Sequence, residues 1–474
     1  MFRKIAIYSA SLYGATLLSS ALSFAVTMVI ARRVPKEALG LYGFYVTLYS
    51  FAGMLLLAGV NQALVKFLAD PREDRRQITR LALGACAVVA SICWPVAALI
   101  VIPFFLLTAF GNSVFRSEFA KWKEVAIVCG VSLTNSVLTV GFLYAATRPS
   151  HAPIAGDLLS YVFPGIIVAL VLVRRAMRPP QAPAAAGPAQ PDALRRLLTF
   201  AWPLTVAGIA FVIYSNAASF LIRGFVGLAA LGDYFFAIQL MHLIDKPLQI
   251  LARVVLTGFA SKPDASPEEH RRFLAFNLVF FPPLAAAVVF LCPFLLLAAD
   301  SVLGTAGAGG EPLATRYAQA PYFVALFALA VPARCVEFLV SSLAIARGKP
   351  QVNRDTHVLT ALIALPALAI LVAAFGATGA AVMPLVYQSI FLTIQTRRFR
   401  ADAPEIVDQN NRGALAGTLL LALAMAPAVL GLGVLWMIPA LAGYVLGGHA
   451  IGGWDLRLLI PKRGRGAQAS PATL

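Results

Sequence analysis

Apolar stretches long enough to cross a membrane follow one another through this chain, from Ile5 to Trp454. Each stretch holds roughly 18 to 27 residues, and a helix needs about 20 to cross a hydrocarbon core of about 30 Å. Because that core holds no water, the backbone of each stretch has to satisfy its own hydrogen bonds as a helix. The sequence therefore predicts an all-α polytopic membrane bundle.

The composition and the polar breaks set the number of spans. Of the 474 residues, 60% are apolar and 12% are charged, which is enough for about fourteen helices of about 20 apolar residues each. The expected spans are residues 7–31, 41–65, 75–95, 97–118, 124–146, 153–173, 198–222, 232–259, 273–298, 319–346, 356–376, 379–396, 413–434 and 436–454. The first stretch is too long for the core of a signal peptide, so it is expected to remain as a helix.

The distribution of basic residues orients these spans. With fourteen spans, most of the 38 Lys and Arg residues fall in every second connection, and such a bias marks the cytoplasmic side. Hydropathy alone allows a single span between residues 81 and 121. A single span there would put the basic segment 174–196 outside, so two spans and cytoplasmic termini are predicted.

Several classes of protein are not indicated by these residues. The formal net charge is +17, but the basic residues form short clusters between apolar spans, so no nucleic-acid partner is expected. The five cysteines lie inside apolar segments without a Cys-x-x-Cys pattern, which favours neither a metal site nor disulfides. Walker, Asp-x-Asp and His-Glu-x-x-His patterns are missing from the sequence, so neither a cofactor nor an enzyme is predicted.

Two segments of the chain resemble each other. Residues 31–42 are echoed 192 residues later by residues 223–234, and both contain Ala-Leu-Gly-x-Tyr. Six spans per copy is an even number, so the copies are expected to be parallel repeats related by an axis along the membrane normal. The chain then divides into a first six-helix half (1–174), a flexible cytoplasmic linker rich in Pro and Ala (175–197), a second half (198–400), an appended helix pair (401–456) and a basic cytoplasmic tail (457–474).

The beginning of the chain resembles a Wzx-type polysaccharide flippase. This family belongs to the multidrug/oligosaccharidyl-lipid/polysaccharide (MOP) exporter superfamily, together with lipid II flippases and multidrug and toxin extruders. The residues that carry the resemblance are Arg32, Glu37, Gly40, Tyr42 and the segment 59–69. The resemblance implies a polyprenyl-diphosphate-linked oligosaccharide as the substrate, and it implies a functional basic residue at Lys66.

Charged residues inside the predicted spans or directly at their ends are the candidates for function, because a charge costs at least a few kcal/mol at the bilayer centre. The candidates for binding the diphosphate and sugars are Arg32, Lys66, Arg223, Lys246, Arg253 and Arg334. The candidates for coupling transport to a proton gradient are His242, Asp245 and Glu337, since a His and a carboxylate on neighbouring turns can exchange protons.

Structural roles are open for the same residues. Arg334 and Glu337 are three residues apart and can neutralise each other on one helical face, while Asp245 can pair with a neighbour. Arg32 and Arg223 fall at corresponding outer ends of the two halves, where they bind an anion or anchor the helices at the interface.

Basic residues outnumber acidic ones inside the spans, which favours an anionic substrate. The sequence therefore predicts a flippase of the bacterial inner membrane that moves a lipid-linked oligosaccharide for O-antigen, capsule or exopolysaccharide biosynthesis by alternating access. Membrane lipids and other polysaccharide assembly proteins are the expected partners. The alternative is a gradient-driven exporter of small cationic or amphiphilic compounds on the same scaffold.

Overall fold

The computed structural model describes residues 2–57, 60–69, 77–80, 83–84, 104, 107–108, 114, 121–145, 159–160, 162–177, 193–261, 267–303, 311–400 and 404–459. This described part is helical and contains no strand. Its α-helices are α1 (Phe2–Arg33), α2 (Lys36–Leu57), α3 (Val60–Ala69), α6 (Lys121–Ala145), α8 (Val162–Met177), α9 (Ala193–Phe225), α10 (Leu228–Ser261), α11 (Pro267–Leu303), α12 (Leu313–Arg316), α13 (Ala320–Ala328), α14 (Val331–Ala346), α15 (Pro350–Phe399), α16 (Pro404–Val429) and α17 (Met437–Ala450).

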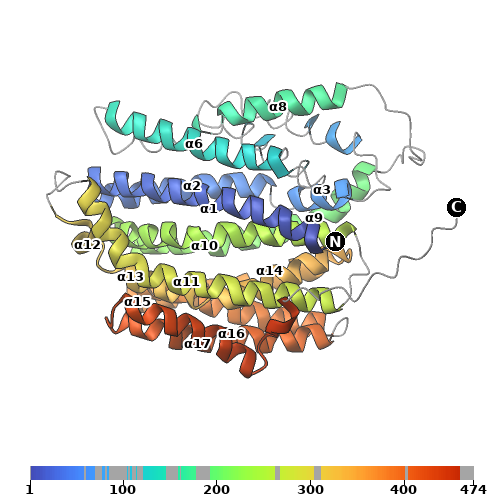
Figure 1. Ribbon diagram of the computed structural model, residues 1–474. Coiled ribbons are helices and arrows are strands. Elements are labelled where there is room, and N and C mark those ends of the chain that lie inside the picture. Colours follow the sequence, from blue (N-terminus) through green and yellow to red (C-terminus); the bar gives the residue numbers. More distant parts are fainter. Residues whose placement is uncertain are drawn as a thin grey trace.

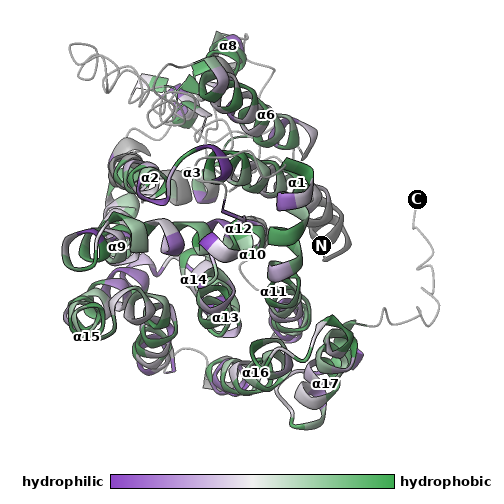
Figure 2. Ribbon diagram, turned by 90° about the vertical axis from the view of Figure 1, so that its left-hand side faces the viewer, coloured by the Kyte–Doolittle hydropathy of each residue, from purple (hydrophilic) through white to green (hydrophobic). Residues whose placement is uncertain are grey.

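The helices form an elongated bundle whose long members lie roughly side by side (Figure 1). α10 packs against α1, α2, α13 and α14, and it lies near the middle when the bundle is viewed along its length (Figure 2). α6 and α8 lie at one edge, and α16 and α17 lie at the other. The core therefore surrounds α10, while the apolar residues of the edge helices face outward, as expected for contact with lipid.

The two ends of the bundle are easily distinguished. α1 begins at one end, where α3 also lies and α9 also begins (Figure 1). We call this the N-terminal end, and it is cytoplasmic in the predicted topology. The opposite end contains α12 and the end of α1.

Seven described helices are long and apolar enough to cross a membrane. An eighth span is formed if α13 and α14, which meet at a bend of 44°, are taken together, and this pair matches the expected span 319–346. The all-helical membrane bundle is thus confirmed. The expected spans 75–95 and 97–118 lie largely outside the described residues, so the total of fourteen stays a prediction.

α15 is a hairpin of two helical segments. Its backbone leaves the helical conformation at Gly376 (φ 60°, ψ −137°), and the Arg398 guanidinium lies 2.8 Å from the carboxylate of Asp355. Residues 43 positions apart in a straight helix would be roughly 65 Å apart, so the chain must turn back on itself. The break lies at the last residue of the expected span 356–376, directly before the turn that the sequence predicts between this span and 379–396.

The expected linker differs from the structure at both of its boundaries. α8 continues to Met177 and α9 begins at Ala193, so the helices extend into the segment 175–197 from each side. Ala193–Leu197 is Ala-Leu-Arg-Arg-Leu, in which every residue favours a helix. The Pro-rich residues 178–192 lie outside the described residues.

Candidate functional site

An ion pair between two helices lies halfway along the bundle. The Arg334 guanidinium of α14 donates a hydrogen bond of 2.6 Å to the Asp245 carboxylate of α10. Asp245 lies near the middle of α10, and Arg334 lies near the middle of the bent pair formed by α13 and α14. The two side chains retain 19% and 13% exposure, so this is a largely desolvated pair at mid-membrane depth, where ionisable residues are costly to keep.

Glu337 and Gln388 extend the charged cluster towards α15. The Gln388 side-chain amide of α15 donates a hydrogen bond of 2.6 Å to Glu337, and both side chains are buried. Arg334 Nε, Asp245 Oδ1 and Gln388 Oε1 have no hydrogen-bond partner within the described part of the chain. Leaving such a buried polar atom unpaired costs about 1–3 kcal/mol, so these three atoms are sites where water or a substrate would be stabilising.

This arrangement bears on one of the structural roles that the sequence leaves open. The sequence allows Arg334 to neutralise Glu337 on its own helix, but the hydrogen bond of Arg334 goes to Asp245, which lies 89 positions away in the chain. Asp245 therefore does have a partner, as the structural interpretation predicted, although on another helix. Helical spacing shows which residues share a face, but it does not show which helices are neighbours.

Aromatic side chains of α9 and α15 lie beside the cluster. Tyr214 and Tyr387 stack with 3.6 Å between their ring centroids. The Tyr387 hydroxyl shares a hydrogen bond of 3.1 Å with His357 Nδ1 in the other arm of the α15 hairpin. Gln388, which binds Glu337, follows Tyr387 directly. The ring stack therefore helps to fix the position of the polar cluster.

The other candidates on α10 have different surroundings. His242 Nδ1 lies 3.2 Å from the side-chain oxygen of Gln239, one turn away. Lys246 follows Asp245 directly and is partly buried. Arg253 lies on the same helix, but its side chain is outside the described residues. The structure thus brings Asp245, Arg334 and Glu337 together, with His242 and Lys246 as neighbours on α10.

Arg32 and Arg223 lie at the opposite end and are not equivalent. Arg32 is only 3% exposed, and it bonds to the Asp300 carboxylate (3.3 Å) and the Glu311 carbonyl oxygen (2.9 Å). This buried side chain joins α1 to the α11–α12 connection, which fits the anchoring role among the two alternatives for Arg32. Arg223 is exposed and stacks on Phe44, with 4.1 Å from its guanidinium carbon to the ring centroid.

Lys66 lies at the N-terminal end, far from the central cluster along the bundle. Its Nζ lies 3.8 Å from the centroid of the Phe200 ring, so α3 and α9 meet through this contact. The candidates therefore separate into a central group, a pair at the opposite end and one residue at the N-terminal end.

Sequence reasoning missed the polar and aromatic residues that complete the centre. Gln388 cannot ionise, and Tyr214 and Tyr387 belong to a residue type that is neutral at neutral pH, so a search for charged residues passes over them. His357 can ionise, but it falls at the start of the expected span 356–376 and is not among the candidates from the sequence. The signal of these residues in the sequence is weak: Tyr387-Gln388 is a polar pair inside the apolar span 379–396.

Residues 8–257, more than half of the chain, match the family of polysaccharide biosynthesis proteins. The chain belongs to this family. No curated protein sequence matched it. The membership confirms the predicted resemblance to proteins of polysaccharide biosynthesis.

Solved structures show the fold of this polysaccharide biosynthesis protein. The lipid II flippase MurJ in an inward closed conformation has a TM-score of 0.63 at 11% identity, covering 93% of this chain and 99% of MurJ. An outward-facing multidrug resistance MATE transporter of the MOP superfamily has a TM-score of 0.56 at 12% identity, covering 84% and 96%. A MOP superfamily transporter from Pyrococcus furiosus has a TM-score of 0.55 at 12% identity, covering 89% and 96%.

Proposed function

We propose that this protein flips a polyprenyl-diphosphate-linked oligosaccharide across the bacterial inner membrane, with both termini in the cytoplasm, for cell-surface polysaccharide biosynthesis. The family supports a role in polysaccharide assembly. The fold is similar to that of a lipid II flippase, whose name describes a lipid-linked substrate.

The observation that carries the proposal is the Arg334–Asp245 pair at mid-depth. A guanidinium in a site of low dielectric constant binds a diphosphate strongly through paired hydrogen bonds. Arg334 Nε has no partner within the described residues, so the arginine retains a donor while it holds Asp245. Lys246 supplies a second positive charge on the adjacent helix, and Arg253 extends the basic set along α10 in this proposal.

Transport then proceeds by alternating access around the central cluster. The sugars occupy the polar centre, and the lipid tail remains in the bilayer between helices. Proton coupling through His242 and Asp245 would require Asp245 to leave Arg334 during the cycle, since the two form an ion pair in this state. Glu337 can then receive the guanidinium, because it lies one turn along the same helix.

The test uses a strain that lacks the gene. We expect lipid-linked oligosaccharide to accumulate on the cytoplasmic leaflet, as measured by mass spectrometry combined with a membrane-impermeant sugar probe. The intact gene should relieve the accumulation, and Arg334→Ala should not. Arg412→Ala is the matched control, because Arg412 is an exposed residue of α16. A normal lipid pool and normal surface glycan in the deletion strain would refute the flippase proposal.

A second candidate function is export of small cationic or amphiphilic compounds. It is favoured by the carboxylates of Asp245 and Glu337, since Asp245 Oδ1 has no partner within the described part and could accept a cation. Increased drug susceptibility of the deletion strain, without a glycan defect, would support this second function.

A further inference from the structure

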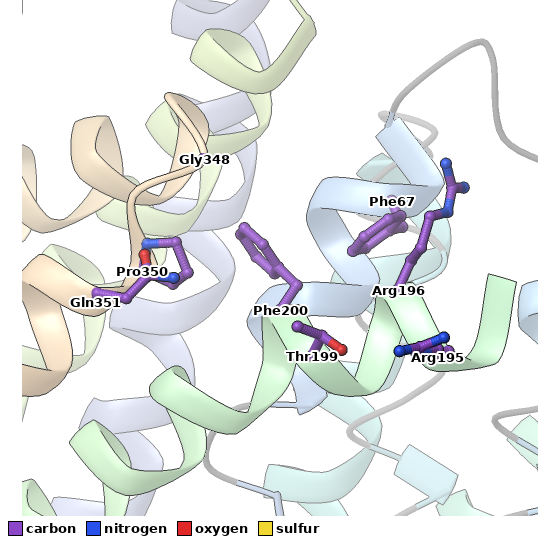
Figure 3. Close-up of a pocket in the computed structure, with 8 residues that line it drawn as sticks. All are labelled: Phe67, Arg195, Arg196, Thr199, Phe200, Gly348, Pro350 and Gln351. Atoms are coloured by element: carbon purple, nitrogen blue, oxygen red, sulfur yellow. The ribbon is translucent and has the colours of Figure 1, made fainter. Parts of the chain in front are cut away.

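A cavity of about 460 Å³ opens at the N-terminal end, away from the central cluster. It lies where α3, the beginning of α9 and the turn between α14 and α15 meet (Figure 3). Its lining includes Phe67, Arg195, Arg196, Phe200, Gly348 and Pro350. A volume of this size is within the range of small-ligand sites.

The lining of the cavity is positively charged. Arg195 and Arg196 project from the first turn of α9 (Figure 3), and none of the lining residues that the structure describes is acidic. Lys66 adds a third positive charge at the edge, since its Nζ would lie 3.5 Å from a Cβ placed on Gly348. α15 begins at Pro350 in the cavity wall, and the beginning of a helix carries partial positive charge. Thr199 and Gln351 complete the lining with polar side chains that can hydrogen-bond to an anion.

The wall of the cavity is well defined. Gly348 has φ 76° and ends α14 in a paired turn, in which the Gly348 N–H donates to Ile345 and the Lys349 N–H donates to Ala344. Phe67 and Phe200 pack edge to face with 5.6 Å between their ring centroids. The turn at Gly348 and the ring pair therefore fix the wall beside the cationic groups, which limits the ordering needed to bind a ligand.

One side of the site leads to the bilayer. Arg195, Leu198 and Trp202 are spaced at three and seven residues, so they share a face of α9. Leu198 is 55% exposed and Trp202 is 66% exposed. An exposed Trp beside a Leu and an Arg is typical of the membrane interface. A molecule with a phosphate head can reach the arginines while its apolar chain lies along Leu198 and Trp202.

We propose that this cavity binds the phosphate groups of a membrane-embedded isoprenoid diphosphate before the headgroup moves to the central cluster. The source of the ligand rests on the proposed flippase function, whereas the anion chemistry stands on the cavity itself. Two arginines bind phosphate oxygens through paired, charge-assisted hydrogen bonds, and the exposed face of α9 accepts the isoprenoid.

The experiment measures equilibrium binding of radiolabelled farnesyl diphosphate to the full chain in nanodiscs of phosphatidylcholine, with empty nanodiscs subtracted. We expect the Arg195→Ala/Arg196→Ala double variant to raise the Kd at least about tenfold, because it removes two charged donors. Arg195→Lys/Arg196→Lys should retain more of the affinity. Arg412→Ala/Arg457→Ala removes the same charge from exposed positions outside the cavity and should leave the Kd within about twofold.

Two further arms identify the source of the phosphate. Inorganic pyrophosphate should bind more weakly than farnesyl diphosphate, and equal affinity would overturn the lipid part of the proposal. Replacing half of the phosphatidylcholine by phosphatidylglycerol should not displace the probe, and displacement would assign the site to bulk anionic lipid. The same Kd in the wild type and the Arg195→Ala/Arg196→Ala variant would overturn the site altogether.

The outcome is separable from that of the flippase test. If binding depends on the two arginines but the lipid pool of the deletion strain is normal, the phosphate site is supported and the flippase proposal is refuted. If lipid-linked oligosaccharide accumulates but binding does not depend on the two arginines, the flippase proposal is supported and the phosphate site is refuted.

Discussion

Gly40 of α2 and Gly232 of α10 pack against each other's helix at the opposite end of the bundle. A Cβ on Gly40 would lie 2.1 Å from the Leu228 carbonyl oxygen, and a Cβ on Gly232 would lie 2.5 Å from the Lys36 carbonyl oxygen. Gly40 and Lys36 precede Gly232 and Leu228 by the same 192 positions. The contact is therefore reciprocal, as at an interface between two copies related by a two-fold axis, which supports the proposed parallel repeat.

Alanine in place of Gly40 or Gly232 should loosen the helix packing at the end of the bundle opposite the N-terminal end. The atoms that a new methyl group would meet belong to the backbone, so the two helices have to move apart. Tyr42 is 8% exposed beside this contact. In a background with the native cysteines replaced, we expect Gly40→Ala or Gly232→Ala to increase labelling of a Tyr42→Cys reporter by an impermeant maleimide severalfold.

Gly141→Ala provides the control for this labelling. Gly141 lies in α6, and a Cβ there has no heavy atom within 4 Å, so labelling of the reporter should not change. Equal rates in all three alanine variants would show that the glycine contact does not hold this end closed.

The Lys36–Asp233 ion pair should stabilise the same end. Lys36 Nζ lies 2.6 Å from an Asp233 carboxylate oxygen, and the Asp233 side chain is 7% exposed. Removing one partner leaves a largely buried charge uncompensated, whereas replacing both with apolar residues does not. We expect Asp233→Asn to lower the thermal unfolding midpoint of the purified protein, and Lys36→Met/Asp233→Leu to recover most of the loss. A double variant less stable than the single one would contradict this account.

Much of the helical layout could be predicted because crossing a membrane is a local property. Apolar length places α6 and α9 within a few residues, and the break at Gly376 falls at the last residue of an expected span. The beginning of α9 was less predictable. Basic residues such as Arg195 and Arg196 are typical of the connections between spans, although they also favour a helix.

The site was less predictable because its contacts join distant parts of the chain. Arg32 meets Asp300 across 268 positions, and Arg334 meets Asp245 across 89. Neither hydropathy nor helical spacing tells which helices are neighbours. The charged members could be found because charge is rare in a membrane. The contact of Arg32 with the α11–α12 connection and the hydrogen bond of Gln388 to Glu337 could not, because they depend on which helices pack together.

Asp245 and Glu337 should compensate for each other around Arg334. Asp245 bonds directly to Arg334, and Glu337 is one turn away on the same face. Asp245→Asn and Glu337→Gln should each reduce the thermal midpoint moderately, since one carboxylate remains. The double variant leaves the guanidinium without an acidic neighbour in the described cluster. Its loss of unfolding free energy should therefore exceed the sum of the losses of the two single variants by at least about 0.5 kcal/mol. Additive losses would show that the two carboxylates act independently.

Tyr387→Phe should weaken the support of the central cluster without changing its charge. The variant keeps the ring that stacks on Tyr214 but removes the hydroxyl that bonds to His357. His357 is otherwise flanked by the rings of Phe211 and Phe391, so losing this partner should cost about 1–3 kcal/mol. We expect a lower thermal midpoint and reduced surface glycan, both measured beside Tyr45→Phe. Tyr45 is 40% exposed on α2, so its variant should match the wild type. If Tyr387→Phe and Tyr45→Phe behave alike, the hydrogen bond between α15's two arms does not position the cluster.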